Sequence, residues 1–241
     1  MLKLDIKLDM PSKIRHHNIG SVLHGVIMEL LPQETVQRLH DYRYNPLKQR
    51  LYFDTHGVTW QIISLEKELT QELTKIFNCC SEVHLRRHDT TLKLLEKNFE
   101  EININFFVEQ FMQSTQLSKF ININFISPTS FKSDGKYDIF PEIRKILRSA
   151  MLTFDYFSDT TKVYDYDALE YMCKCISIVD YSLKSAKFGL EGVKIPGFKG
   201  GITLKVAGNL QILQLAHLLI NFGQLSGIGI KTSMGMGGVR L

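Results

Sequence analysis

Apolar and polar residues alternate along the first half of the chain with two different periods. Residues 2–8, LKLDIKL, alternate one by one, which predicts a β-strand with one face toward water. Residues 20–31 carry apolar side chains at helical spacing, and Pro32 predicts a break before a second helix at residues 33–42. The other elements of this half are predicted as a hairpin of residues 51–54 and 58–63 around residues 55–57, a helix at 65–77, and strands at 83–86 and from 91 onward.

The second half repeats the same order of elements. They are predicted as a strand at 120–126, helices at 141–157 and 167–175, strands at 176–188 and 193–206, a helix at 210–222 and a short strand at 236–241. Strand, helix, two strands, helix and strand is the order of a ferredoxin-like module. The pattern therefore predicts an α+β protein with two tandem ferredoxin-like (RRM-like) βαββαβ domains, at residues 1–115 and 116–241, and a glycine-rich loop near the carboxyl end.

The pentapeptide ININF occurs at residues 102–106 and again at 121–125. Alternating isoleucines recur in strands, so we interpret the repeat as a local strand hairpin. It places the domain junction near residues 110–118.

Charge and composition narrow the class of protein. The chain has 241 residues, a net charge of +4 and a pI of about 8.8, a mild basic excess that permits a polyanionic partner without requiring one. No apolar run is long enough for a membrane span or resembles an export signal. Few cysteines and the lack of an export signal lead us to expect a cytoplasmic protein. Adjacent and one-apart cysteines are poor zinc spacings, so we expect structural roles for Cys79, Cys80, Cys173 and Cys175.

Glycines crowd the segment GQLSGIGIKTSMGMGGVRL at residues 223–241. Such a loop exposes backbone N–H groups and lets a phosphate backbone approach closely, although tight packing alone would also explain the glycines. A P-loop is excluded, because Ile230 rather than glycine precedes Lys231 and no helix follows. The residues expected to bind RNA are Gly227, Gly229, Lys231, Thr232, Ser233 and Gly235.

This tail resembles the signature glycine loop of the CRISPR-associated repeat-processing endoribonucleases, which belong to the repeat-associated RNA-binding (RAMP) superfamily. Three other segments agree with the family and keep its order. They are Leu23–Ile27, Ile126–Lys132 followed by Tyr137 and Phe140, and Lys194–Gly200. The resemblance spans nearly the whole chain, and the tail is its most specific part.

The resemblance implies an endoribonuclease that cuts each repeat of a CRISPR precursor transcript at one phosphodiester. It implies attack by the RNA 2′-hydroxyl, products with a 5′-hydroxyl and a 2′,3′-cyclic phosphate, and no metal or other cofactor. Such a reaction needs a general base, a general acid and a cation that stabilises the charge growing on the phosphate. Histidine suits both proton transfers because its unperturbed pKa lies near 6.5.

The resemblance makes His40 the first candidate, since it stands at the family's position at the end of the second helical segment. Position alone would make it an ordinary surface histidine. His24 is the second candidate, because its helical position turns it away from the apolar stripe. Lys48 stands near the family's lysine and is the preferred cation, with Arg50 and Arg43 as rivals. Met28 stands where several members have tyrosine.

Two other functions compete with the endoribonuclease. A non-catalytic RNA-binding subunit of a CRISPR effector complex would have the same fold and bind RNA without cutting it. A small-molecule enzyme with a ferredoxin-like fold is more distant, since fold alone does not fix function. CRISPR repeat RNA is the expected partner, an effector complex and a homodimer stay open, and no membrane partner is expected.

Overall fold

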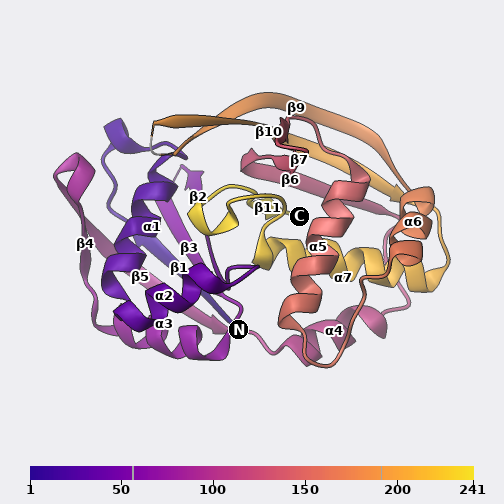
Figure 1. Ribbon diagram of the computed structural model, residues 1–241, viewed down its shortest axis with the longest axis horizontal. Coiled ribbons are helices and arrows are strands. Elements are labelled where there is room, and N and C mark those ends of the chain that lie inside the picture. Colours follow the sequence, from indigo (N-terminus) through magenta and orange to yellow (C-terminus); the bar gives the residue numbers. More distant parts are fainter. Residues whose placement is uncertain (56, 191) are drawn as a thin grey trace. The chain divides into compact units, whose positions relative to one another are not determined.

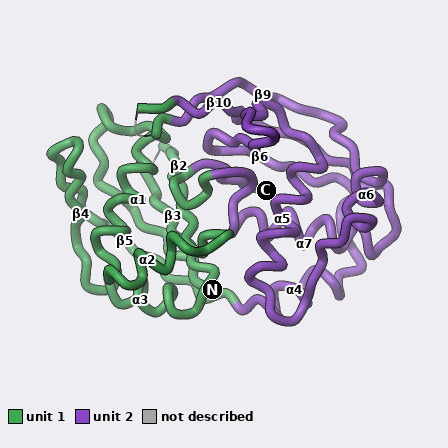
Figure 2. Tube along the Cα trace, viewed as in Figure 1, with its two compact units in different colours: residues 1–102, 189–193, 231–235 green, residues 103–188, 194–230, 236–241 purple. Residues whose placement is uncertain are grey.

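The computed structural model describes residues 1–55, 57–190 and 192–241 and divides into two compact units (Figure 2). Unit 1 comprises residues 1–102, 189–193 and 231–235, and unit 2 comprises residues 103–188, 194–230 and 236–241. The expected domain boundary at 115/116 falls inside unit 2, so the assignment of domains at that position stays a prediction. His56, at the tip of the predicted hairpin, lies outside the described residues.

Unit 1 is built on a five-stranded sheet in the order β2-β3-β1-β5-β4. The strands are β1 (Leu2–Leu8), β2 (Leu47–Asp54), β3 (Gly57–Ser64), β4 (Glu82–Leu85) and β5 (Thr90–Glu101). Strand β1 is antiparallel to β3 on one side and to β5 on the other. The predicted alternation of β1 is confirmed, because its four apolar side chains are buried in the core: Leu2, Leu4, Ile6 and Leu8.

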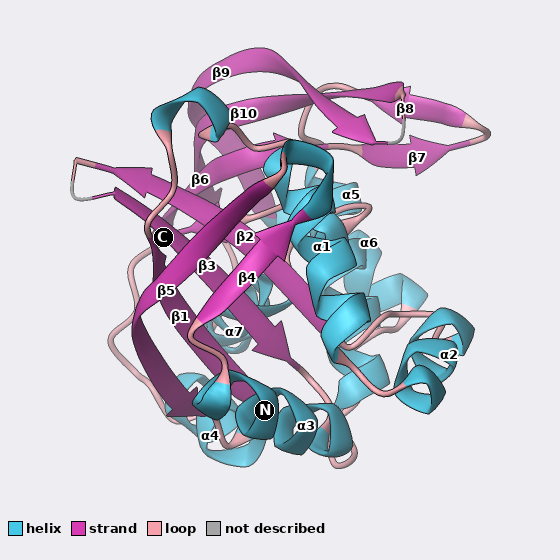
Figure 3. Ribbon diagram, turned by 90° about the vertical axis from the view of Figure 1, so that its left-hand side faces the viewer, coloured by secondary structure: helices cyan, strands magenta, loops and turns pink. Residues whose placement is uncertain are grey.

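Helices cover one face of this sheet (Figures 1 and 3). They are α1 (Ile19–Leu30), α2 (Gln33–Asp41) and α3 (Lys67–Cys79). The Trp60 indole of β3 packs edge-on against the Phe77 ring of α3, with 5.6 Å between ring centroids. Without its extra edge strand β4, the sheet has the strand order of a ferredoxin-like module with helices on one face, as predicted.

Unit 2 repeats this arrangement with a sheet in the order β11-β6-β10-β9. Its strands are β6 (Phe120–Thr129), β9 (Ile176–Leu190), β10 (Val193–Val206) and β11 (Val239–Arg240), and its main helices are α5 (Ile143–Phe157), α6 (Tyr166–Cys175) and α7 (Leu210–Ser226). Phe154 of α5 packs edge-on against Phe222 of α7, with 5.2 Å between ring centroids. The predicted tandem ferredoxin-like α+β fold is therefore confirmed.

The hairpin interpretation of the repeated pentapeptide is wrong. Only the second copy forms a strand, within β6, and its partners are β10 and β11. The first copy leads into α4 (Ile104–Met112), because the side chain of Asn103 accepts hydrogen bonds from the backbone N–H groups of Asn105 and Phe106. Asn122 occupies the same place in the second copy, so the same five letters form a helix start or a strand according to their surroundings.

Two further elements escaped the sequence pattern. They are α4 and a short hairpin of β7 (Phe131–Ser133) and β8 (Lys136–Asp138). Among the described residues, none of the helices combines the length and apolarity that crossing a bilayer requires.

Gly197 lets strand β10 approach β6 closely. A Cβ atom at Gly197 would lie 2.2 Å from the carbonyl oxygen of Thr129, which is shorter than any van der Waals contact. By contrast, a Cβ at Gly25, inside helix α1, meets no atom within 4 Å.

We therefore expect Gly197→Ala to destabilise the protein by about 1–3 kcal/mol, because backbone atoms must shift to make room. Gly25→Ala is the matched control and should stabilise by about 0.5–1 kcal/mol, since alanine favours a helix interior. Urea unfolding of both variants measures the difference. Equal stability of the two variants would contradict the close approach.

Candidate functional site

Lys48 lies in strand β2 and not in the loop before it. The predicted strand began at residue 51, whereas the observed one begins at Leu47. The Asn45 side chain fixes this start, because its Nδ2 donates to the Leu39 carbonyl and its Oδ1 accepts from the Leu47 N–H. Lys48 and Arg50 are buried polar residues inside this strand, and their charges made the segment look like a loop.

The Lys48 ammonium is held out of water. Only 6% of Lys48 is exposed, and its Nζ lies 2.9 Å from the Oγ1 of Thr232, which is also buried. Burial lowers the pKa of Lys48 to about 7, and the nearby charge of Arg50 contributes to this. The side chain therefore changes between its neutral and charged forms near neutral pH.

The segment 231–235 of the glycine-rich tail belongs to unit 1 and contacts β2 and α1 there. Lys231 has a left-handed backbone with φ +56°, and Gly235 has φ +101°. Between them, Thr232–Met234 forms one 3-10 turn, closed by the Met234 N–H on the Lys231 carbonyl. These backbone angles turn Thr232 toward β2.

The turn packs closely against Gly20 at the start of α1. A Cβ atom on Gly20 would lie 2.8 Å from the Met234 carbonyl oxygen, so only glycine permits the contact without a shift. The Gly20 carbonyl in turn accepts a hydrogen bond from the buried Gln49 side chain of β2, which also accepts from the Trp60 indole. Gln49 and Gly20 were missed by the sequence analysis. For Gln49, the signal that could have found it is the run of three polar residues at 48–50, directly before the predicted strand.

His24 lies half-buried on α1, beside the same turn. Burial lowers the pKa of His24 below the ordinary value of an imidazole, while the Ser233 carbonyl raises it. Within the described residues, the buried Nδ1 of His24 has no hydrogen-bond partner. A buried polar atom without a partner costs stability. Proteins tolerate this cost mainly where the atom serves a function, so the free Nδ1 marks His24 as a candidate for chemistry.

His40 stands exposed near the end of α2. Its positive charge, and that of Lys231, lower the pKa of His24, so both groups lie within electrostatic reach of that ring. The structure thus brings the three predicted catalytic residues into one neighbourhood of unit 1. The members of this His–Lys cluster are His24, His40, Lys48, Lys231, Thr232 and Ser233.

Two further predicted RNA-binding residues, Gly227 and Gly229, have backbone N–H groups that already donate to protein acceptors. Gly227 is buried and its N–H donates to the Gly223 carbonyl, while the Gly229 N–H donates to Ser149 Oγ. A Cβ on Gly229 would lie 2.4 Å from the Ser130 carbonyl oxygen. Their N–H groups are therefore already used, which favours the packing alternative. RNA binding by these glycines stays a prediction.

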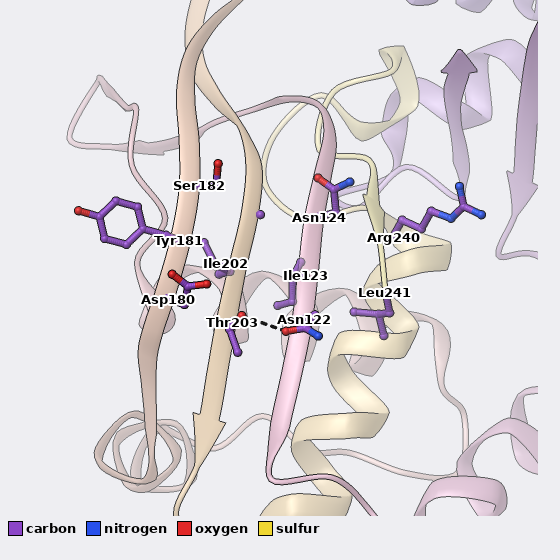
Figure 4. Close-up of a pocket in the computed structure, with 11 residues that line it drawn as sticks. Asn122, Ile123, Asn124, Asp180, Tyr181, Ser182, Ile202, Thr203, Arg240 and Leu241 are labelled. Atoms are coloured by element: carbon purple, nitrogen blue, oxygen red, sulfur yellow. Dashed lines mark hydrogen bonds between the residues drawn. The ribbon is translucent and has the colours of Figure 1, made fainter. Parts of the chain in front are cut away.

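A second candidate lies on the outer face of the unit 2 sheet, where a shallow pocket of about 280 Å³ opens (Figure 4). Thr203 donates a hydrogen bond to Asn122 across it, and its other polar lining residues include Asp180, Ser182 and Arg240. It contains no histidine or lysine, so it lacks the groups that general acid–base chemistry at neutral pH needs. The His–Lys cluster is the stronger candidate.

Other chemistry-bearing residues lie apart from the cluster members. The His217 ring nitrogen Nε2 lies 2.8 Å from the Ser118 carbonyl, as expected for a structural histidine. The four cysteines are free thiols. In the described ranges, no three His, Cys, Asp or Glu side chains gather as a metal-binding group.

Comparison with known proteins agrees with the resemblance seen in the sequence. The family described as "CRISPR-associated endoribonuclease Cas6" matches residues 123–239. A CRISPR-associated endoribonuclease Cas6 of Streptococcus thermophilus is 29% identical over 98% of this chain and 94% of its own length, and one from Mycobacterium tuberculosis is 29% identical over 100% and 77%. A solved Cas6 product complex shares the fold, with a TM-score of 0.80, 20% identity and coverage of 100% and 99%.

The lowered pKa of Lys48 predicts a pH dependence of stability. The unfolded chain holds the lysine proton up to about the ordinary value of 10.5, whereas the folded chain releases it near 7. Since the unfolded state binds more protons between these values, the free energy of unfolding should rise with pH across this window, by about 1 kcal/mol per pH unit.

Lys48→Met removes the titrating group and keeps an unbranched side chain of similar length. Urea unfolding at several values between pH 7 and 9 should therefore show a steeper rise for the parent protein than for the variant. Identical slopes would mean that Lys48 titrates normally.

Proposed function

We propose that this chain is a CRISPR-associated endoribonuclease of the Cas6 type and that it cuts CRISPR repeat RNA in precursor transcripts to release guide RNAs. In the proposed reaction the RNA 2′-hydroxyl attacks the adjacent phosphorus. The new 2′-O–P bond forms as the P–O5′ bond breaks, leaving a 2′,3′-cyclic phosphate and a 5′-hydroxyl. The RNA supplies its own nucleophile, so no metal is needed to activate a water molecule.

One observation carries this proposal: two imidazoles, a buried ammonium and the turn at 231–235 share one neighbourhood of unit 1. The reaction needs a base, an acid and a cation, and these groups offer all three. A non-catalytic RNA-binding subunit would require no such convergence of titratable groups.

The two imidazoles divide the proton transfers. The lowered pKa of His24 keeps its ring neutral at neutral pH, which is the form that accepts the proton of the 2′-hydroxyl. His40 is exposed and therefore accessible to the leaving 5′ oxygen, to which it gives a proton. His40 stays the first catalytic candidate, since it also stands at the family's position.

Lys48 stabilises the negative charge of the phosphate. Its pKa of about 7 leaves the free side chain only partly charged, but a phosphate beside it favours the ammonium form. RNA binding thus produces the cation that the reaction requires. Lys231 is exposed and Ser233 half-buried on the same turn, and we propose that both contact the RNA backbone.

The RNA is the one partner this proposal requires. Association with an effector complex or with a second copy of the chain stays a prediction.

The first test uses labelled repeat RNA with and without a 2′-deoxy nucleotide at the cleavage site. We expect the all-ribose RNA to be cut, with unchanged rate in EDTA, and the deoxy RNA to bind without being cut. The product ends are identified by phosphatase and kinase treatment. Loss of cleavage in EDTA would reject the metal-free reaction, and binding without any cleavage would identify a non-catalytic RNA-binding subunit.

The second test substitutes the cluster histidines and lysine one at a time. His40→Ala and His24→Ala should each reduce the single-turnover cleavage rate by roughly 100-fold to 10,000-fold, the range typical of a lost proton-transfer group. Lys48→Ala should reduce it by roughly 100-fold to 1,000-fold, the range typical of losing one group that stabilises developing charge. His217→Ala is the matched control and should cut normally, because His217 lies outside the cluster. Full activity of His40→Ala would remove it from the mechanism.

A further inference from the structure

Thr232 was expected to bind RNA, but its hydroxyl points at a protein group. Its Oγ1 accepts a hydrogen bond from Lys48 Nζ at 2.9 Å, and the bond joins residues 184 positions apart. Thr232 is 8% exposed and Lys48 is 6% exposed. A hydroxyl so placed has little access to the phosphates of a bound strand.

Neighbouring contacts fix the backbone conformation around Thr232. Lys231 adopts a left-handed conformation, which costs a non-glycine residue about 1–3 kcal/mol and persists only where neighbours enforce it. The close approach of Gly20 to Met234 and the 3-10 turn supply that enforcement. Thr232 is therefore presented to Lys48 by a rigid turn.

The chemical nature of the acceptor that binds Lys48 Nζ decides whether the charge of the ammonium is neutralised. In the described part of the chain, Thr232 Oγ1 is the one hydrogen-bond acceptor found for this ammonium, and no carboxylate forms an ion pair with it. A carboxylate would hold the ammonium but also neutralise it. A neutral hydroxyl fixes the direction of the side chain and leaves its charge available to an anion.

We propose that Thr232 is a positioning residue that holds the Lys48 ammonium toward the scissile phosphate, and that it is not an RNA-binding residue. This inference rests on the proposed function, because it gives Lys48 its role there. The tail turn then contributes to the rate of cleavage through Lys48, while Lys231 and Ser233 contribute to affinity for RNA.

The test compares Thr232→Val, which removes the hydroxyl and keeps the shape, with Thr232→Ser, which keeps the hydroxyl. Thr232→Val should reduce the single-turnover cleavage rate at saturating enzyme by roughly 10-fold to 100-fold, the size expected for a lost hydrogen bond to a charged group. The Kd for repeat RNA carrying a 2′-deoxy block should change less than about twofold. Thr232→Ser should restore most of the rate.

Thr153→Val is the matched control. Thr153 is 6% exposed and its hydroxyl bonds only within helix α5, to the Ser149 carbonyl, so its loss should leave the cleavage rate unchanged. The thermal midpoints of all variants show whether any of them is simply less folded.

A double-mutant cycle separates action through Lys48 from a direct effect. Thr232→Val should have no further effect in the Lys48→Ala background, because the group it positions is gone. A higher Kd with an unchanged rate in Thr232→Val would overturn the proposal and restore Thr232 as an RNA contact. So would a full additional loss in the Lys48→Ala background.

Failure of this inference differs from failure of the proposed function. If Lys48→Ala cuts normally, the role of Lys48 itself is wrong. If Lys48→Ala is impaired while Thr232→Val is as active as the parent, only the positioning role is wrong.

Discussion

The candidate site depends on an ammonium group that is held in the protein interior by a neutral hydroxyl. A charged lysine is costly to bury, and the low pKa of Lys48 expresses that cost. Leu47 and Gln49, the neighbours of Lys48 in sequence, are buried as well, so the ammonium lies among packed residues. A buried charge that lowers stability is typical of a functional site, which supports the proposed role of Lys48.

The glycine-rich tail serves two different purposes along its length. At Gly229 the absence of a side chain allows close packing of backbone on backbone, within unit 2. At residues 231–235 the chain instead forms a strained turn that carries Thr232 to Lys48. Glycine richness, interpreted as a single signature of phosphate binding, therefore combines a packing role with the role in the candidate site that we propose for residues 231–235.

Local pattern predicted most of the fold, whereas the members of the candidate site were named mainly through the family resemblance. The alternation in residues 2–8 and the helical spacing of residues 20–31 determine elements almost to the residue, since burial of one face decides them. Helix α4 was missed because its first residues repeat a sequence that forms a strand in β6, and the five letters, cap asparagine included, are the same in both copies. The first half of strand β2, which contains Lys48, was missed because its polar side chains are buried, which no periodicity indicates.

The pairing of Lys48 with Thr232 has a consequence for the timing of activity in a newly made chain. During synthesis the amino-terminal sheet can form early, since domains fold as they emerge from the ribosome. Thr232, whose hydroxyl accepts from Lys48, is added to the chain 184 positions later. We therefore expect the Lys48 side chain to lack its positioning hydroxyl, and the chain to lack full cleavage activity, until Thr232 has been added and the turn around it has formed.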